Sequence, residues 1–226
     1  MLFRSEDRNK FSKLCDAIGV DQPEWASLTT LQEAYTFAAR IGYPVLVRPS
    51  YVLSGSAMSV IWQEQDMQLY LASASRVSGK HPVVISKYHL EAKEYDVDVV
   101  AHEGTVLCYS CCEHIENAGV HSGDATMFLP PQSTDQATID KMIELTRKVA
   151  HALAVTGPLN VQFLRTTAGE LKVIEANLRA SRSVPFVSKV LGLSFPAVMV
   201  EAFVAAKGAK LAPIAQGPLL QLDYVG

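Results

Sequence analysis

Apolar residues recur along the chain at two spacings, one typical of helices and the other of strands. Between Phe11 and Ile18 they return every three or four residues and are followed by Gly19, which predicts an amphipathic helix that ends at the glycine. Residues 134–153 predict a longer helix, whose apolar side is made by Ile139, Met142, Ile143, Val149 and Leu153. Further helices are expected over residues 30–42, where Thr30 and Glu33 suit a capping box, and over residues 66–77 and 195–205.

Short apolar runs bounded by turn residues predict the strands. They cover residues 45–48, 58–62, 83–86, 95–100, 105–112, 160–164 and 171–175. Residues 102–104 and 166–169 are expected to form turns, and residues 50–57 and 115–126 to form loops. Helices and strands mix without a regular β-α-β rhythm, so the pattern favours an α+β fold with antiparallel strands.

Composition and charge narrow the classes of function. Hydrophobic residues make up 49% of the chain and charged residues 19%, which supports a packed core. The formal net charge is −3, so no strong field points to nucleic acid or to a membrane surface. No apolar run approaches the roughly 18 residues that suggest a membrane span. We therefore expect no nucleic-acid partner and no membrane.

The cysteines raise the question of a metal site. Cys108, Cys111 and Cys112 lie close together near His114, but in a run that reads as a strand. Strand alternation sends Cys111 and Cys112 to opposite faces, whereas zinc ligands converge. The pattern favours reduced, buried cysteines and, because the N-terminus also lacks a secretory signal, a cytoplasmic protein.

The most informative polar residues lie on two strands expected to form a hairpin. If the turn is centred on residues 166–169, antiparallel pairing places Gln162 opposite a residue near Glu175, and Asn177 projects to the same face. Three oxygen-bearing side chains on one face suit Mg²⁺, which prefers hard ligands and leaves positions for phosphate oxygens. A solvated polar face is the alternative interpretation.

Two arginines directly follow the hairpin and strengthen the interpretation as a metal site. Arg179 and Arg182 beside a carboxylate suit anionic phosphates, although surface ion pairing is a common use of such residues. Arg48 opens the small-residue loop 50–57, where backbone N–H groups could approach a phosphate, and an ordinary connection is the alternative there.

Several strings, in this order, resemble one family across nearly the whole chain. They are residues 6–8, 42–55, 94–98, 113–124, 175–182 and 184–189. Together they resemble the ATP-grasp domain of the carbamoyl phosphate synthetase large chain. The resemblance implies an ATP-grasp fold, in which two lobes with antiparallel sheets grip ATP between them. It implies an ATP-grasp domain over residues 1–206, a small lobe inserted at roughly 43–115, and a linker over 207–226 toward a C-terminal allosteric domain.

The large chain of this family carries two related halves, and two strings resemble the second. Residues 48–55 lack the richer glycine loop of the first half, and residues 113–124 also follow the pattern of the second. The resemblance therefore implies ATP- and Mg-dependent phosphorylation of carbamate to carbamoyl phosphate. Ser54 and Gly55 look more like the eukaryotic pyrimidine-pathway enzymes than the bacterial ones.

The resemblance also implies a role for each matching position. Residues that would contact ATP are Arg8 and Arg48 at the phosphates, Lys87, His89 and Glu94 around adenine and ribose, and Gly119, Val120, His121 and Ser122 closing over the nucleotide. Gln162, Glu175 and Asn177 would hold Mg²⁺ or Mn²⁺. Gln162 and Glu175 would also contact ATP. Arg179 and Arg182 would steady the transferred phosphoryl group and carbamate.

The implied partners are ATP, carbamate and the rest of the synthetase. That remainder comprises the first ATP-grasp half, a glutamine amidotransferase and the allosteric domain. Two other functions stay open at this point. One is another enzyme of the same fold, such as a biotin-dependent carboxylase, and the other is a nucleotide-binding module without turnover.

Overall fold

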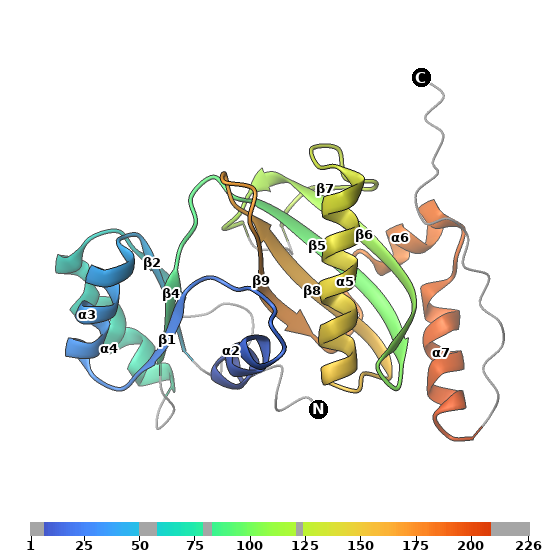
Figure 1. Ribbon diagram of the computed structural model, residues 1–226, viewed down its shortest axis with the longest axis horizontal. Coiled ribbons are helices and arrows are strands. Elements are labelled where there is room, and N and C mark those ends of the chain that lie inside the picture. Colours follow the sequence, from blue (N-terminus) through green and yellow to red (C-terminus); the bar gives the residue numbers. More distant parts are fainter. Residues whose placement is uncertain (1–6, 50–57, 79–82, 121–123, 209–226) are drawn as a thin grey trace.

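The structure is a computed structural model that describes residues 7–49, 58–78, 83–120 and 124–208. Two lobes lie side by side, each built on its own sheet (Figure 1). The strand order is β1-β4-β2-β3 in the smaller sheet and β7-β6-β5-β8-β9 in the larger, with every neighbouring pair antiparallel. The predicted α+β architecture with two antiparallel sheets is confirmed.

The small lobe packs two helices on a four-stranded sheet. Its elements are β1 (Trp25–Leu28), α3 (Leu31–Ile41), β2 (Val45–Pro49), β3 (Ser59–Ile61), the 3₁₀ turn η2 (Glu64–Asp66), α4 (Met67–Ser78) and β4 (Val83–Lys87). Val45, Val47 and Ile85 form the core with Phe37 and Met67 from the helices. The capping box that starts α3 is present.

The large lobe covers one face of its sheet with helices. Its elements are α2 (Arg8–Ala17), β5 (Lys93–His102), β6 (Thr105–Asn117), β7 (Met127–Phe128), α5 (Gln136–Ala152), β8 (Gly157–Arg165), β9 (Leu171–Asn177), α6 (Val184–Leu191) and α7 (Phe195–Ala205). Helix α5 lies across this face in Figure 1, and its Met142 and Val149 share a core with Val97, Val161 and Phe163. Alternation along the strands therefore sends apolar side chains toward α5.

The opposite face of the large sheet is apolar at one end of β5 and polar at the other. Val100 packs against Phe195 and Val198 of α7, so α7 covers one end of this face. Glu94, Asp96 and Asp98, on the same face by alternation, are buried polar residues. This polar half of the face carries the candidate site.

Several predicted boundaries needed correction. The predicted loop 115–126 is wrong at its start, because β6 continues to Asn117 and pairs with β5 at Lys93. The four-residue strand β1 and the helix α6 were not predicted. Strand β1 lacks alternation and is held by pairing with β4, which no local pattern reveals. The helix predicted over residues 195–205 is confirmed to the residue.

The predicted lobe boundaries do not match the sheets. The smaller sheet runs from Trp25 to Lys87, so it begins well before residue 43. Strands β5 and β6, which the range 43–115 assigned to the small lobe, belong to the larger sheet. Of the predicted linker 207–226, only Lys207 and Gly208 lie within the described residues, where their N–H groups close the end of α7.

The cysteines are buried and free. Cys111 packs in the core under α5, whereas Cys108 and Cys112 face α7, as alternation predicted. Burial raises the pKa of the Cys108 thiol to about 11. Within the described ranges, no cluster of three or more His, Cys, Asp or Glu residues is placed to hold a metal ion.

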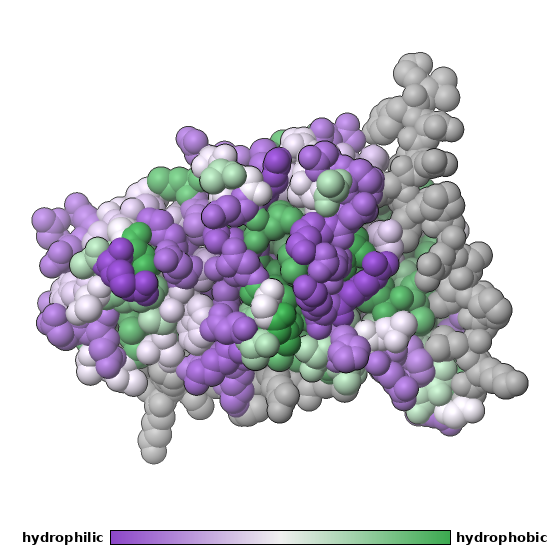
Figure 2. Space-filling model, in the orientation of Figure 1, coloured by the Kyte–Doolittle hydropathy of each residue, from purple (hydrophilic) through white to green (hydrophobic). Residues whose placement is uncertain are grey.

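Hydrophilic residues cover most of the face that carries α5, with smaller hydrophobic areas beside that helix (Figure 2). Among the described helices, none alone has the length and apolar character needed to cross a membrane. The two helices α6 and α7 meet those criteria only as a pair, and they are bent by 104° relative to each other.

Candidate nucleotide and metal site

The hairpin of β8 and β9 brings the predicted metal ligands together. Gln162 is paired with Glu175, and Asn160 is paired with Asn177. The register therefore confirms that Gln162, Glu175 and Asn177 share one face. The ladder contains a bulge between Gln162 and Phe163, so Phe163 pairs with Val173 and both lie in the core under α5. The bulge therefore lets Glu175 face the polar side although Val173, two residues earlier, faces the core.

Glu175 lies where the two lobes meet. Arg8 of α2 donates from Nη2 to Glu175 Oε2 at 2.9 Å. Burial raises the pKa of Glu175, but Arg8, a hydrogen bond from Asn177 and the charge of Arg48 lower it by more, so the net shift is downward. The carboxylate is therefore held ionised beside two arginines.

Arg48 reaches the same place from β2 of the small lobe. Arg48 is 8% exposed, and among the described residues its Nη2 donates to Ser86 Oγ at 3.4 Å, a long hydrogen bond. Within the part of the chain that the structure describes, its buried Nε atom has no hydrogen-bond partner. Burial and the charge of Arg8 lower the pKa of Arg48 to about 9, against the opposing effect of Glu175. An under-paired buried cation is costly to the fold and suits an anionic ligand.

Glu94 lies on the same face of the sheet, close to Gly119, the first of the predicted lid residues 119–122 that would close over the nucleotide. Burial raises its pKa to about 7, with Asp96 adding to the rise, while His114 and a hydrogen bond from the Gly119 backbone N–H lower it. A carboxyl group with this pKa changes charge near neutral pH.

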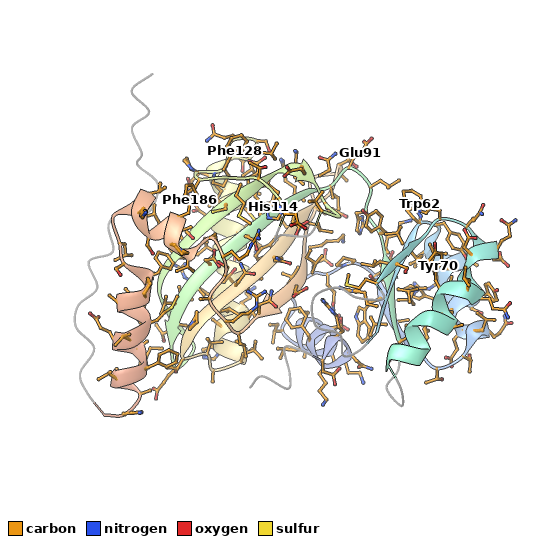
Figure 3. The ribbon with its side chains drawn as sticks, turned by 180° about the vertical axis from the view of Figure 1, so that it is seen from behind. Trp62, Tyr70, Glu91, His114, Phe128 and Phe186 are labelled. Carbon is orange, nitrogen blue, oxygen red and sulfur yellow. The ribbon has the colours of Figure 1, made fainter. Side chains whose placement is uncertain are left out.

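A buried ion pair beside Glu94 was not predicted from the sequence. His114 Nε2 lies 2.6 Å from Asp96 Oδ2, and both side chains are at most 3% exposed. Burial lowers the pKa of His114, but Asp96 and Glu94 raise it by more. His114 lies among the strands of the large sheet (Figure 3). Glu94, Asp96 and His114 are all even-numbered residues on two strands that pair, so alternation places their side chains on one face. This pattern in the sequence could have revealed the contact.

Lys87 and His89 flank the connection between the lobes. Lys87 Nζ donates to the carbonyl oxygens of Gly42 at 3.0 Å and Tyr43 at 3.2 Å, so the structure ties it to the turn before β2. His89 Nε2 is buried and has no hydrogen-bond partner among the described residues. Burial and the charge of nearby Lys172 lower the pKa of His89. His89 therefore presents a neutral ring with an unused nitrogen.

The lid residues begin at a close backbone contact. Tyr88 Oη donates to the Ala118 carbonyl at 3.2 Å. Gly119 has φ +113°, which other residues rarely adopt, and a Cβ there would lie 2.3 Å from Tyr88 Oη, so a larger residue would strain the backbone and displace the tyrosine hydroxyl. Val120 is exposed. The remaining predicted lid residues, His121 and Ser122, lie outside the described residues, as does the small-residue loop 50–57.

Arg179 and Arg182 are exposed on the segment that follows β9. Arg179 Nη1 donates to the Ala180 carbonyl at 3.3 Å. Both arginines lie within five residues of Asn177 in the chain. The structure thus brings Arg8, Arg48 and Glu175 into contact or close approach, with Gln162 and Asn177 beside them.

Comparison with known families decides the assignment. Residues 7–214 match the family described as "Carbamoyl-phosphate synthase L chain, ATP binding domain". The chain belongs to this family. The match supports an ATP-binding role for the carbamoyl-phosphate synthase domain described above.

Curated relatives of this synthase domain are much longer proteins. The multifunctional protein pyrABCN of Emericella nidulans is 50% identical over 226 residues, which is 100% of this chain and 10% of that protein. The arginine-specific large chain of carbamoyl phosphate synthase, mitochondrial, of Neurospora crassa is 56% identical over 197 residues, 85% of this chain and 17% of that protein. The chain thus spans between a tenth and a fifth of these relatives.

Solved structures establish the fold of the synthase domain. A biotin carboxylase–ATP complex from Campylobacter jejuni matches with a TM-score of 0.81 at 21% identity, covering 92% of this chain and 47% of that one. The biotin carboxylase domain of the 2-oxoglutarate carboxylase from Hydrogenobacter thermophilus matches with a TM-score of 0.78 at 18% identity, covering 92% and 46%. The likeness shows the ATP-grasp fold.

The residues of the hairpin fit a divalent metal ion. Two amide oxygens and one carboxylate are hard donors of the kind that Mg²⁺ prefers, and they sit on adjacent, paired strands. The lowered pKa of Glu175 keeps that ligand charged. In the synthase domain, Gln162, Glu175 and Asn177 would hold such an ion.

Proposed function

We propose that this domain binds ATP with Mg²⁺ or Mn²⁺ and transfers the γ-phosphoryl group to carbamate, giving carbamoyl phosphate and ADP. One observation carries the proposal: Glu175, flanked by two amide ligands, faces Arg8 and Arg48 from two other elements. That arrangement offers places for both a metal ion and a polyphosphate. Membership of the synthase family supports carbamate as the acceptor.

The residues act by positioning and by neutralising charge. Arg8 and Arg48 would bind phosphate oxygens, and Glu94 would accept hydrogen bonds from ribose hydroxyls. A carbamate oxygen attacks the γ-phosphorus, and the bond to the bridging oxygen breaks as ADP leaves with its electrons. A divalent metal ion held by Gln162, Glu175 and Asn177 would supply positive charge to offset the negative charge that develops during the transfer. Arg179 and Arg182 would add fixed donors to the transferred group.

The assignment to carbamate, and not to bicarbonate, is supported by sequence. Residues 48–55 and 113–124 resemble the carbamate-phosphorylating half of the synthetase. We infer that the first half, a glutamine amidotransferase and an allosteric domain complete the enzyme. Four buried free thiols are compatible with a cytoplasmic setting, which stays part of the proposal.

The reverse reaction tests the proposal without the rest of the synthetase. The full chain is mixed with ADP, carbamoyl phosphate and MgCl₂, and ATP is measured by luciferase. We expect ATP to form, to depend on the metal, and to be unaffected by biotin. Biotin-stimulated ATP cleavage without ATP synthesis would instead indicate a carboxylase. Metal-dependent ATP binding without transfer would indicate a binding module, and either result contradicts the proposal.

A further inference from the structure

Side-chain hydrogen bonds hold both ends of the segment that carries Arg179 and Arg182. It leaves β9 directly after Asn177, whose Nδ2 donates to Asn160 Oδ1 at 3.4 Å. Asn160 Nδ2 in turn donates to Asp98 Oδ1 at 3.0 Å. At the far end, the Ser183 hydroxyl donates to Asp98 Oδ2. One carboxylate therefore connects the start and the end of the arginine segment, residues 178–183.

The strand register explains why Asp98 can do this. Asp98 on β5 is paired with Asn160 on β8, and Asn160 is paired with Asn177 on β9, so the three side chains form one row across the sheet. The neighbouring row is Asp96, Gln162 and Glu175. The row of Asp98 thus runs directly beside the row that includes two candidate metal ligands.

The environment of Asp98 indicates a fixed structural anchor. Its side chain is 2% exposed, and an isolated carboxylate at such a site is costly unless hydrogen bonds satisfy it. Ser183 is itself 7% exposed, and its hydroxyl lies 2.6 Å from that of Ser181, which adds a second bond within the segment. Both oxygens of Asp98 are therefore used. Oδ2 accepts directly from Ser183 of the segment, whereas Oδ1 accepts from Asn160, which in turn bonds to Asn177 just before the segment.

We propose that Asp98 is a positioning residue for phosphoryl transfer. It holds the end of segment 178–183 through Ser183 and the start through Asn160, and so fixes the backbone that carries Arg179 and Arg182. The inference rests on the proposed function, since it assigns those arginines to the transferred group. Asp98 itself would touch neither the nucleotide nor the metal ion. It acts only through the residues it holds.

Ser183→Ala is the variant that tests the inference, because it opens the closure and removes only one hydroxyl. The matched control is Ser110→Ala. Ser110 lies on β6, where it is paired with Asp98 of β5, and it is 3% exposed. Its hydroxyl has no hydrogen-bond partner within the described ranges. Asp98→Asn is the second test variant, since it keeps the shape of the side chain but exchanges an acceptor for a donor.

Two measurements on the full chain separate positioning from general damage. In the reverse reaction, we expect Ser183→Ala and Asp98→Asn to lower the maximal rate by about tenfold while the ATP dissociation constant changes by less than about twofold. Amide hydrogen exchange, read by mass spectrometry, should be at least about tenfold faster over residues 178–183 in Ser183→Ala and unchanged in β8 and β9. Ser110→Ala should match the wild type in both.

The outcomes are distinct. Equal exchange over residues 178–183 in Ser183→Ala and Ser110→Ala overturns the inference, as does an unchanged maximal rate in an active wild-type background. If the wild type forms no ATP, the proposed function fails, and the exchange comparison still decides whether Asp98 closes the segment. Faster exchange across the whole sheet would show global loosening and would also count against a positioning role.

Discussion

Strands β5 and β8 have two faces of opposite chemistry, although both faces are buried. On the face under α5, Val97 and Val161 are fully buried among apolar neighbours. On the other face, Asp96 and Asn160 are each 2% exposed and are joined by a hydrogen bond of 2.9 Å. Burial therefore does not distinguish core from site in this domain. The distinction is whether a buried side chain is stabilised by apolar contact or by a specific polar partner.

The two faces should contribute differently to stability. Apolar burial contributes roughly 25 cal/mol per Å² removed from water. A buried polar group first loses its hydration, and its hydrogen bonds largely offset that loss instead of adding to stability. We therefore expect the face under α5 to dominate the free energy of unfolding and the polar face to dominate function. Substitutions on the two faces can separate these roles.

The largest expected effect is on function, from Glu175→Ala on the polar face. Loss of the central ligand should lower ATP formation by at least about a thousandfold, because charge neutralisation by the metal ion accounts for several kcal/mol of the barrier. The urea midpoint should change little, since the Glu175 side chain is 31% exposed. The control is Glu170→Ala in the turn of the same hairpin, which should behave as wild type. Turnover like wild type in Glu175→Ala refutes the metal assignment.

The next effect is on stability, from Phe163→Ala on the face under α5. Phe163 is fully buried in the core, and such truncations cost about 3–5 kcal/mol. Urea unfolding followed by circular dichroism measures the loss. Phe186→Ala is the control, because Phe186 is 46% exposed and should cost far less. Equal losses in the two variants would contradict the contrast between core and surface.

A pH-dependent effect is expected from Glu94. Its pKa rises from the usual 4.5 to about 7, chiefly through burial, so the folded state holds a proton that the unfolded state releases. This contribution to stability is complete below about pH 4.5 and is lost as the pH rises to about 7, a change on the order of 3 kcal/mol. Glu94→Gln should lack this decline. Unfolding at pH 5 and pH 8 tests it, and parallel pH profiles in wild type and variant would exclude it.

The smallest expected effect is on ATP affinity, from Arg48→Ala. The variant should bind ATP about 10- to 100-fold more weakly, since a charge-assisted contact to phosphate contributes about 1.5–3 kcal/mol. Its stability should not fall correspondingly, because buried Arg48 is poorly paired without ligand. Arg40→Ala, which removes an arginine stacked on Phe37 in the same lobe, is the control. Isothermal calorimetry that shows equal affinities for Arg48→Ala and wild type would count against the phosphate role.

Local patterns in the sequence predicted the elements whose stability is local. The helix over residues 195–205 and the capping box at Thr30 and Glu33 agree with the structure, because spacing and capping involve residues within a few positions of one another. The face shared by Gln162 and Glu175 was also predicted, since one short turn joins their strands. The lobe boundaries were not predicted correctly, because they depend on which strands pair when those strands are far apart in the sequence.

Strand alternation by itself was an incomplete guide even on the hairpin. Val173 and Glu175 are two residues apart on β9, yet Val173 lies in the core under α5 and Glu175 pairs with Gln162 on the polar face. The bulge in the β8–β9 ladder separates them, because an extra residue reverses the alternation. A bulge depends on the register of two strands and has no clear signal in one of them.

The sequence by itself determined the class of fold, the elements with strong local periodicity and, through ordered motifs, the family. Only the tertiary structure decided that Arg8 meets Glu175 across 167 residues, that His114 pairs with Asp96 inside the sheet, and that Asp98 anchors the arginine segment. These contacts join strands and helices that are far apart in the chain. Their formation depends on sheet register and on burial in a common core, which arise only when the whole chain has folded.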